Sequence, residues 1–378
     1  MDDFGAVICG AGIAGVEAAL RLRRLAGDRV QMTLVSPDEE LVYRPLAVRE
    51  PFARTGARRY PIAQLVEDLG ARWVRDAVES VDPAHSTVHT ASGVELSNDA
   101  LLLALGGRER APFDHAQVFT DRNADDTYHG IVQDIEAGYV TSLVLVQPDG
   151  PTWPVPLYEL ALMTAERADS MNMKPQITLV TPDARPLQAF GGGAAEAVER
   201  LLEEAGITLF TGSAARVLGA RHLVIEPAGA ELHPEQIVTL PTIHGPGLPG
   251  IAATEPYGFV PIDSHCRVRD SDGSVFAAGD ATDFPIKHGG IAAQQADTAA
   301  AGIAHLAGAG GPPPPFEPVI RGMLLTGRKP LYLAAHVVEG RGWHSEIYEQ
   351  PPWPADEKVI SEELGPYLRS HESAAPRP

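Results

Sequence analysis

Three glycines near the N-terminus have the spacing of a loop that can bind a diphosphate. They lie in Gly10-Ala11-Gly12-Ile13-Ala14-Gly15, between an apolar strand predicted over residues 4–9 and a helix predicted over residues 13–25. Gly10 permits a tight turn, Gly12 lets phosphate approach the backbone, and Gly15 lets the helix pack closely on the sheet. The order of strand, loop and helix favours this interpretation over an ordinary glycine-rich turn. The predicted phosphate site therefore contains Gly10, Gly12, Ile13, Ala14 and Gly15.

The strand predicted over residues 30–35 should end beside a bound ribose. An acidic residue is usual at this point, because a carboxylate accepts hydrogen bonds from the ribose hydroxyls. Here the strand is followed by Ser36, and Asp38 or Glu39 comes shortly after it. We therefore predict that Ser36 contacts the ribose.

A second motif lies far along the chain, in Ser274-Val275-Phe276-Ala277-Ala278-Gly279-Asp280-Ala281-Thr282. One glycine loop alone is weak evidence for a function. The two motifs in this order, at opposite ends of the chain, predict bound FAD and hence an electron-transfer enzyme.

Composition excludes several functions. The chain has 378 residues and a formal net charge of -20, which argues against nucleic acid or an anionic membrane surface as a partner. No apolar stretch is long enough to span a bilayer, and no secretory leader is expected. The two cysteines, Cys9 and Cys266, form no Cys-x-x-Cys pair, so we expect structural thiols in a soluble, cytoplasmic protein.

The pattern of elements predicts an α/β protein with two Rossmann-like domains and a small C-terminal segment. The FAD-binding domain is expected over residues 1–112 and 245–310, and a degenerate NAD(P)-binding-like domain over residues 113–244. Residues 311–378 would form an interface segment and a tail. Within the first domain, residues 73–81 and 86–96 are predicted to pair as two strands.

An apolar cluster over residues 320–334 is predicted to pack between domains or to form a homodimer surface. A quinone-side or membrane contact is the alternative, which the acidic net charge disfavours.

The ordered motifs resemble those of the pyridine nucleotide–disulfide oxidoreductase superfamily of flavoproteins. The resemblance rests on the first glycine loop, on Tyr43-Arg44-Pro45-Leu46, on Ala104-Leu105-Gly106 and on Gly279-Asp280. Together with Pro285-Ile286-Lys287-His288-Gly289-Gly290, the Tyr-x-Pro-Leu stretch looks closest to sulfide:quinone oxidoreductases and type II NADH dehydrogenases. The resemblance covers residues 1–310 and is weak in the middle domain.

The resemblance implies a role at each matching position. Asp280 would accept hydrogen bonds from the FAD ribityl chain, and Gly279 would permit the turn that presents it. Lys287 and the start of a helix at residue 291 would place positive charge beside the flavin. The remaining cofactor contacts implied by the family are Arg44, Pro45, Val78, Ala104, Gly106, Gly290 and Ile291.

Two departures from the family bear on function. The middle domain has no glycine loop at residues 146–156, where four prolines remove backbone donors and Trp153 could fill the nicotinamide space. No cysteine lies at the positions of the family's redox cysteines. Candidate catalytic residues are Lys287, Glu159 and Tyr158. Tyr158 and Glu159 are placed to face the flavin, and Glu159 is the acid–base candidate; the alternative is a structural glutamate that the helix dipole favours at a helix start. No metal site is expected.

These features predict an FAD-dependent oxidoreductase that exchanges electrons or hydride with a small molecule or a protein partner. Three alternatives stay open. The first is an NAD(P)H:acceptor oxidoreductase of the quinone type, the second is a flavin-binding protein without catalysis, and the third is a reductase served by a ferredoxin or a rubredoxin-like carrier.

Overall fold

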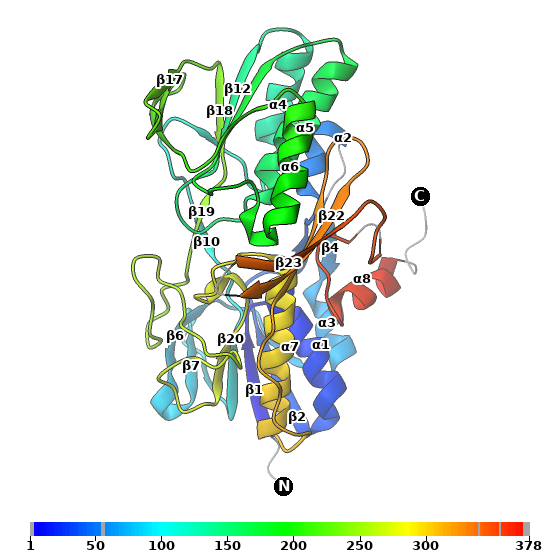
Figure 1. Ribbon diagram of the computed structural model, residues 1–378. Coiled ribbons are helices and arrows are strands. Elements are labelled where there is room, and N and C mark those ends of the chain that lie inside the picture. Colours follow the sequence, from blue (N-terminus) through cyan, green and yellow to red (C-terminus); the bar gives the residue numbers. More distant parts are fainter. Residues whose placement is uncertain (1–3, 54–56, 339–340, 355–356, 373–378) are drawn as a thin grey trace.

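Two parallel sheets form the centres of two lobes in the computed structural model (Figure 1), which describes residues 4–53, 57–338, 341–354 and 357–372. The end of the predicted tail, residues 373–378, lies outside the described residues. The first sheet consists of β20 (Val275–Ala277), β9 (Ala100–Leu103), β1 (Phe4–Cys9), β2 (Val30–Val35) and β5 (Arg72–Val74), in that spatial order. The second consists of β11 (Gln117–Val118), β18 (Gln236–Thr239), β12 (Ser142–Val146), β13 (Gln176–Val180) and β14 (Thr208–Phe210).

The chain leaves the first lobe after β9 and returns to it before β20. The two crossing segments pair as antiparallel strands, β10 (Arg108–Arg110) and β19 (Thr242–His244), at the junction of the lobes (Figure 1). The first lobe is therefore discontinuous in sequence. The predicted α/β class with two Rossmann-like units is confirmed.

Helices cover the sheets and bury them. In the first lobe, α1 (Ile13–Ala26) and α7 (Gly289–Leu306) pack side by side, with α3 (Ile62–Leu69) beyond α1 (Figure 1). Every residue of β9 is buried, as expected for a parallel strand enclosed on both faces. The helices of the second lobe are α4 (Ala124–Glu136), α5 (Val155–Ser170) and α6 (Gly192–Glu204), and the short α2 (Glu50–Ala53) packs on α4.

Each lobe also contains smaller antiparallel sheets. The first lobe carries β3 (Glu40–Tyr43) with β4 (Arg58–Pro61), and β6 (Val78–Asp82) with β7 (Thr87–Thr90) and β8 (Glu95–Ser97). The second lobe carries β15 (Ala214–Gly219), β16 (His222–Glu226) and β17 (Ala230–Leu232). The prediction of a single strand over residues 73–81 is wrong, because the start of this segment belongs to β5 in the parallel sheet and its end belongs to β6. Residues 86–96 are likewise divided between β7 and β8.

The predicted apolar cluster lies in a C-terminal sheet of β21 (Val319–Leu324), β22 (Leu331–Val338) and β23 (Arg341–Tyr348). Six of its side chains are buried in the core that surrounds the second sheet: Ile320, Met323, Leu324, Leu325, Tyr332 and Leu333. The cluster therefore packs within the chain. These buried side chains are unavailable for the alternative contact with a quinone or a membrane.

A buried carboxylate attaches the C-terminal helix α8 (Leu364–Glu372) to α1. Glu17 of α1 is fully buried and accepts hydrogen bonds from the backbone N–H groups of Glu362, Glu363 and Leu364, at 2.8, 3.0 and 2.6 Å. These N–H groups lie at the start of α8, where a helix offers unpaired donors and the positive end of its dipole. The contact joins residues near the two ends of the chain.

Candidate functional site

The first glycine loop has the shape of a phosphate cradle. Gly10 has a φ of +112°, and a Cβ there would overlap the carbonyl group of Ala104 at the end of β9. A Cβ on Gly15 would overlap the carbonyl group of Gly10, whereas a Cβ on Gly12 would meet no described atom within 4 Å. Two glycines therefore allow close packing, and the third leaves open space in front of the backbone.

The start of α1 supplies donors toward this space. Gly12 is the N-cap and has no side-chain cap, and the first N–H of the helix to bond internally is that of Val16, which donates to the Gly12 carbonyl at 3.0 Å. The preceding N–H groups therefore have no partner inside the helix. A diphosphate suits this arrangement, since it is an anion that accepts several hydrogen bonds.

The second motif packs directly on the first. Gly279 has a φ of +80°, and a Cβ there would lie 3.3 Å from the Cβ atoms of Ala14 in α1 and Ala292 in α7. Its N–H donates to Oε1 of Gln295 in α7 at 2.8 Å. A Cβ on Gly107, just before β10, would lie 3.4 Å from the Cβ of Asp280. The residues present thus fit a bound dinucleotide, and the two sequence motifs form one site.

The predicted ribose contact Ser36 and two further predicted cofactor contacts, Val78 and Gly106, belong to the first lobe. Ser36 follows β2, and its hydroxyl accepts the N–H of Asp38 at 3.3 Å. Gly10 donates to the carbonyl of Val35 at 2.8 Å, so Ser36 begins next to the glycine loop. Val78 is half-buried at the start of β6, and Gly106 adopts a left-handed conformation with φ +68°. Contacts of Ser36, Val78 and Gly106 with a cofactor stay predictions.

A cavity of about 210 Å³ lies where the lobes meet. Four predicted residues line it: Arg44, Pro45, Asp280 and Lys287. Residues from both lobes complete the wall, among them Trp153, Pro156 and Lys358. Arg44 donates to the carbonyl of Asp121 at 2.7 Å, which fixes its guanidinium at the rim.

Lys287 and Asp280 form the charged floor of the cavity. The Lys287 ammonium donates to the carbonyl of Thr282 at 2.5 Å and lies 3.5 Å from the ring centre of Phe259. Burial lowers the pKa of Lys287 to about 8, with a partial opposing effect from Asp280. Burial raises the pKa of the Asp280 carboxyl, and Lys287 offsets part of that rise. Each side chain therefore favours the charged form of the other.

The start of α7 is covered by other side chains of the protein, and the cofactor contacts of Gly290 and Ile291 stay predictions. The N–H of Gly290 donates to Nδ1 of His288 at 3.2 Å, and Ile291 is buried in the core of the second lobe. Trp153 packs against His288 with ring centres 4.5 Å apart and ring planes tilted by 40°. Burial lowers the pKa of His288 to about 4, so this imidazole is neutral at pH 7. Neither Gly290 nor Ile291 lines the cavity.

Glu159 and Tyr158 do not face the cavity, contrary to the sequence-based expectation. Both are fully buried in α5. The Glu159 carboxylate accepts the N–H of Leu325 at 2.9 Å and lies 2.6 Å from the ammonium of Lys358. Burial raises the pKa of both side chains, and Lys358 opposes the rise for Glu159. Glu159 reaches the cavity only through Lys358, which makes it a positioning residue.

Sequence reasoning missed Lys358, which comes from the C-terminal segment. A usable signal exists in the composition, because the chain has only four lysines and two of them, Lys287 and Lys358, line this cavity. Nothing in the local pattern around Lys358 distinguishes it from a solvated loop residue.

Both cysteines lie in the core of the first lobe. Cys9 ends β1, and Cys266 precedes β20; each is fully buried, and neither lines the cavity. Burial raises the pKa of the Cys9 thiol to about 12 and raises that of Cys266 as well. These thiols are therefore protonated at neutral pH, and a protonated thiol is a poor nucleophile.

Comparisons with known proteins agree with this fold. Residues 4–146 match the family model of pyridine nucleotide-disulphide oxidoreductases. A sulfide-quinone reductase of Aquifex aeolicus (strain VF5) is 24% identical over 300 residues, which cover 74% of this chain and 68% of that protein.

Two solved structures show the same architecture. The sulfide:quinone oxidoreductase from Aquifex aeolicus superposes with a TM-score of 0.78 at 20% identity, over 92% of this chain and 87% of that one. The reductase of a covalent putidaredoxin reductase–putidaredoxin complex superposes with a TM-score of 0.63 at 19% identity, over 88% and 82% of the two chains.

The fold, the paired glycine motifs and the cavity define a flavoprotein oxidoreductase whose cofactor is FAD. Residues 4–146 match the pyridine nucleotide-disulphide oxidoreductase family, and the chain as a whole resembles sulfide:quinone oxidoreductases. In the part of the chain that the structure describes, every helix is too short or too polar to cross a membrane.

Proposed function

We propose that this oxidoreductase passes electrons through noncovalent FAD without a dithiol relay and without NAD(P)H as its donor. The partner would be a small molecule or a protein electron carrier that meets the flavin at the cavity between the lobes.

The start of α5 is the observation that carries the proposal. A nicotinamide dinucleotide bound to the second lobe would need its diphosphate at this helix start, in front of the loop after β12. Pro154 caps α5 without a side-chain hydrogen bond, Pro156 has no N–H, and the N–H of Leu157 already donates to the Pro154 carbonyl at 3.0 Å. The loop thus offers an anion far fewer donors than the start of α1 does.

Trp153 strengthens this argument. Its ring packs between Phe190, at 5.9 Å between ring centres, and His288, at 4.5 Å. The indole therefore occupies the wall of the cavity on the side of the second lobe. A nicotinamide ring that entered from this side would have to displace it.

The positions of the cysteines support the absence of a dithiol relay. A relay requires a thiolate within reach of both substrate and flavin. Cys9 and Cys266 are buried in the core of the first lobe and have raised pKa values. A sulfide-type substrate would therefore have to react without a covalent link to this chain.

Bound FAD would supply the hydride or electron chemistry, and the chain would position and charge the site. The glycine loop and the start of α1 hold the diphosphate. Lys287 and Lys358 place two positive charges at the cavity, where they favour an anionic substrate or negative charge on the cofactor. Glu159 holds Lys358 in place.

We also propose that a homodimer or a partner protein binds at the edge strand β23. The described part of this strand exposes Trp343 and Ile347, whose relative accessibilities are 63% and 39%. An exposed apolar pair on the edge strand of a sheet supports such a contact.

Anaerobic stopped-flow absorbance near 450 nm tests the proposed donor. The FAD-loaded protein is mixed with NADH, with NADPH and with dithionite as a positive control. We expect dithionite to bleach the flavin and both nucleotides to leave it oxidised for at least minutes. Rapid bleaching by either nucleotide would overturn the proposal and favour an NAD(P)H:acceptor oxidoreductase.

Two further outcomes separate the remaining alternatives. Turnover with sulfide, a quinol or a reduced ferredoxin identifies the class of donor. Tight FAD binding without turnover by any of these donors would instead favour a flavin-binding protein that is not a catalyst.

A further inference from the structure

Two histidines and a glutamate converge on one hairpin of the second lobe. In the β16–β17 pair, Val224 lies opposite Glu231 and Leu223 opposite Leu232. The next step of this register places His222 opposite His233. Since side chains alternate between the faces of a strand, His222, Glu231 and His233 lie on the same face. The opposite face carries Leu223 and Ile225, which are fully buried and hold the hairpin against the lobe.

The three polar side chains already point at one another. Nε2 of His222 lies 2.6 Å from Oε1 of Glu231, and Nε2 of His233 lies 3.6 Å from the same oxygen. The two imidazole rings stack with centres 4.6 Å apart and planes at 22°. One potential ligand atom from each residue lies within 4.8 Å of the others.

We propose that this triad binds a divalent metal ion of the zinc class. Zn²⁺ takes imidazole nitrogen and carboxylate oxygen at about 2.1 Å, and tetrahedral geometry then separates the ligand atoms by about 3.4 Å. The observed separations of 2.6 and 3.6 Å lie on either side of this value. Small rotations of the side chains therefore suffice to admit the ion, and water completes its coordination.

The setting favours a cation. Glu231 and His233 are exposed, so the ion keeps contact with water and no charge has to be buried. Arg216 of the same sheet is engaged with Glu226 at 3.4 Å. Glu231 therefore supplies one negative charge and the histidines supply two neutral nitrogens.

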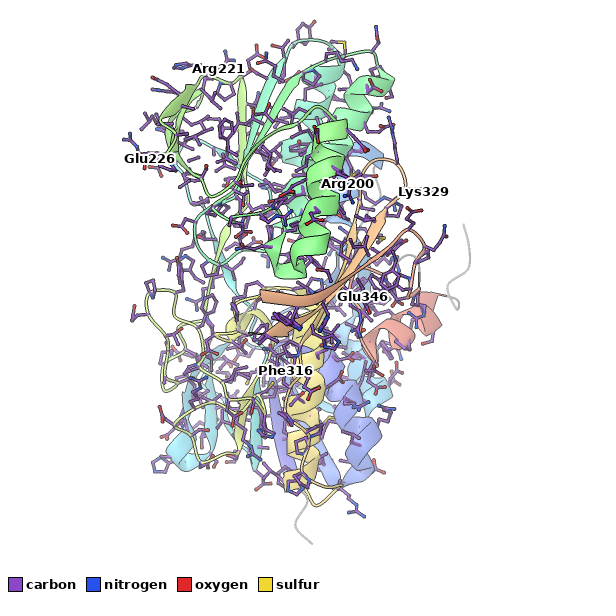
Figure 2. All side chains as sticks on the ribbon, viewed as in Figure 1. Arg200, Arg221, Glu226, Phe316, Lys329 and Glu346 are labelled. Atoms are coloured by element: carbon purple, nitrogen blue, oxygen red, sulfur yellow. The ribbon has the colours of Figure 1, made fainter. Side chains whose placement is uncertain are left out.

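The ion would act on the hairpin and leave the flavin site unchanged. Figure 2 labels Arg221, which directly precedes β16, and Glu226, the last residue of β16, at the outer edge of the second lobe, away from α7 and the junction of the lobes. None of the three ligands lines the cavity that contains Lys287. The metal would cross-link β16 to β17, which adds a constraint to a sheet held by only two short strand pairings.

A calorimetric titration with Zn²⁺ of the FAD-loaded protein, treated beforehand with EDTA, tests the site. Elemental analysis after dialysis then measures how much zinc stays bound. We expect one tight equivalent per chain. His222→Ala and His233→Ala should each weaken that equivalent at least tenfold. Co²⁺ should give visible absorption bands with the wild type that both variants lose.

The matched control is His85→Ala. His85 also lies at an exposed strand turn and pairs with a carboxylate, Asp82, at 2.8 Å, but the described residues place no second histidine there. This variant should bind Zn²⁺ as the wild type does. Glu231→Gln retains an acceptor for His222 and tests the contribution of the carboxylate without removing a side chain.

An unchanged stoichiometry and affinity in the His222→Ala/His233→Ala double variant would overturn the proposal, because the bound metal would then lie elsewhere. Each variant is compared in EDTA first. A melting temperature equal to that of the wild type shows that lost binding reflects lost ligands and that the hairpin is still folded.

Discussion

Replacement of Glu159 by glutamine should destabilise the protein strongly. Glu159 is fully buried, and Lys358 has only 11% of its side chain exposed, so the substitution leaves a nearly buried ammonium group without its counter-ion. Removal of one partner of a buried ion pair costs about 3–5 kcal/mol. Glutamine can still accept the Leu325 N–H, so that hydrogen bond is retained. At about 2–4 °C per kcal/mol for a domain of this size, the melting temperature should fall by about 6–20 °C.

Differential scanning calorimetry of the FAD-loaded protein measures this change. Glu166→Gln is the matched control, since Glu166 lies on the same helix but pairs with the exposed Arg328, and its loss should cost less than about 1 kcal/mol. The double variant Glu159→Gln/Lys358→Met should recover most of the lost stability. An unchanged melting temperature in Glu159→Gln together with abolished turnover would refute this reasoning and make Glu159 a proton carrier.

Two further predictions concern the cofactor site. Gly10→Ala should lower the free energy of unfolding by about 2–5 kcal/mol, because of the positive φ and the overlap with the Ala104 carbonyl, and FAD should be released on gel filtration. Gly12→Ala should keep the melting temperature of the FAD-free protein and weaken only the affinity for FAD. Equal losses of stability in the two variants would contradict the packing argument. Lys287 has a folded pKa of about 8 against 10.5 when unfolded, so the unfolded chain binds more protons between these values and stability rises with pH. Urea titrations of the FAD-free protein should show that the free energy of unfolding of the wild type rises by about 3 kcal/mol between pH 8 and 10.5, relative to that of Lys287→Met. The same pH dependence in both proteins would refute the assignment.

The cofactor half of the site could be predicted from the sequence because its signals are local. The strand, loop and helix around Gly10 and Gly12 follow one another directly, and β1 and α1 match their predicted positions to within a residue. Gly279 was predicted for its turn, and its contact with Ala14 explains why the second motif must accompany the first. A glycine motif encodes its own backbone geometry, so one sequence suffices to find it.

The substrate side could not be predicted because its partners are distant in the chain. Glu159 has the position of an acid–base residue at a helix start, and only its contacts with Lys358 and Leu325 show that it is a buried structural anion. The strand around Trp73 was misassigned for a related reason: its alternation suits both a parallel and an antiparallel neighbour, and only the tertiary structure selects β2 as the partner. His222 and His233 likewise become neighbours only through the hairpin register.

The attachment of α8 to Glu17 has a consequence for how the protein is made. Synthesis proceeds from the N-terminus, and domains tend to fold as they emerge from the ribosome. Glu17 is synthesised 345 residues before its partner Glu362, and Lys358 precedes that partner by only a few positions. The carboxylate of Glu17 therefore stays in water until the segment before α8 has been made. A chain that stops before Lys358 would contain the phosphate cradle but would lack one charged wall of the cavity.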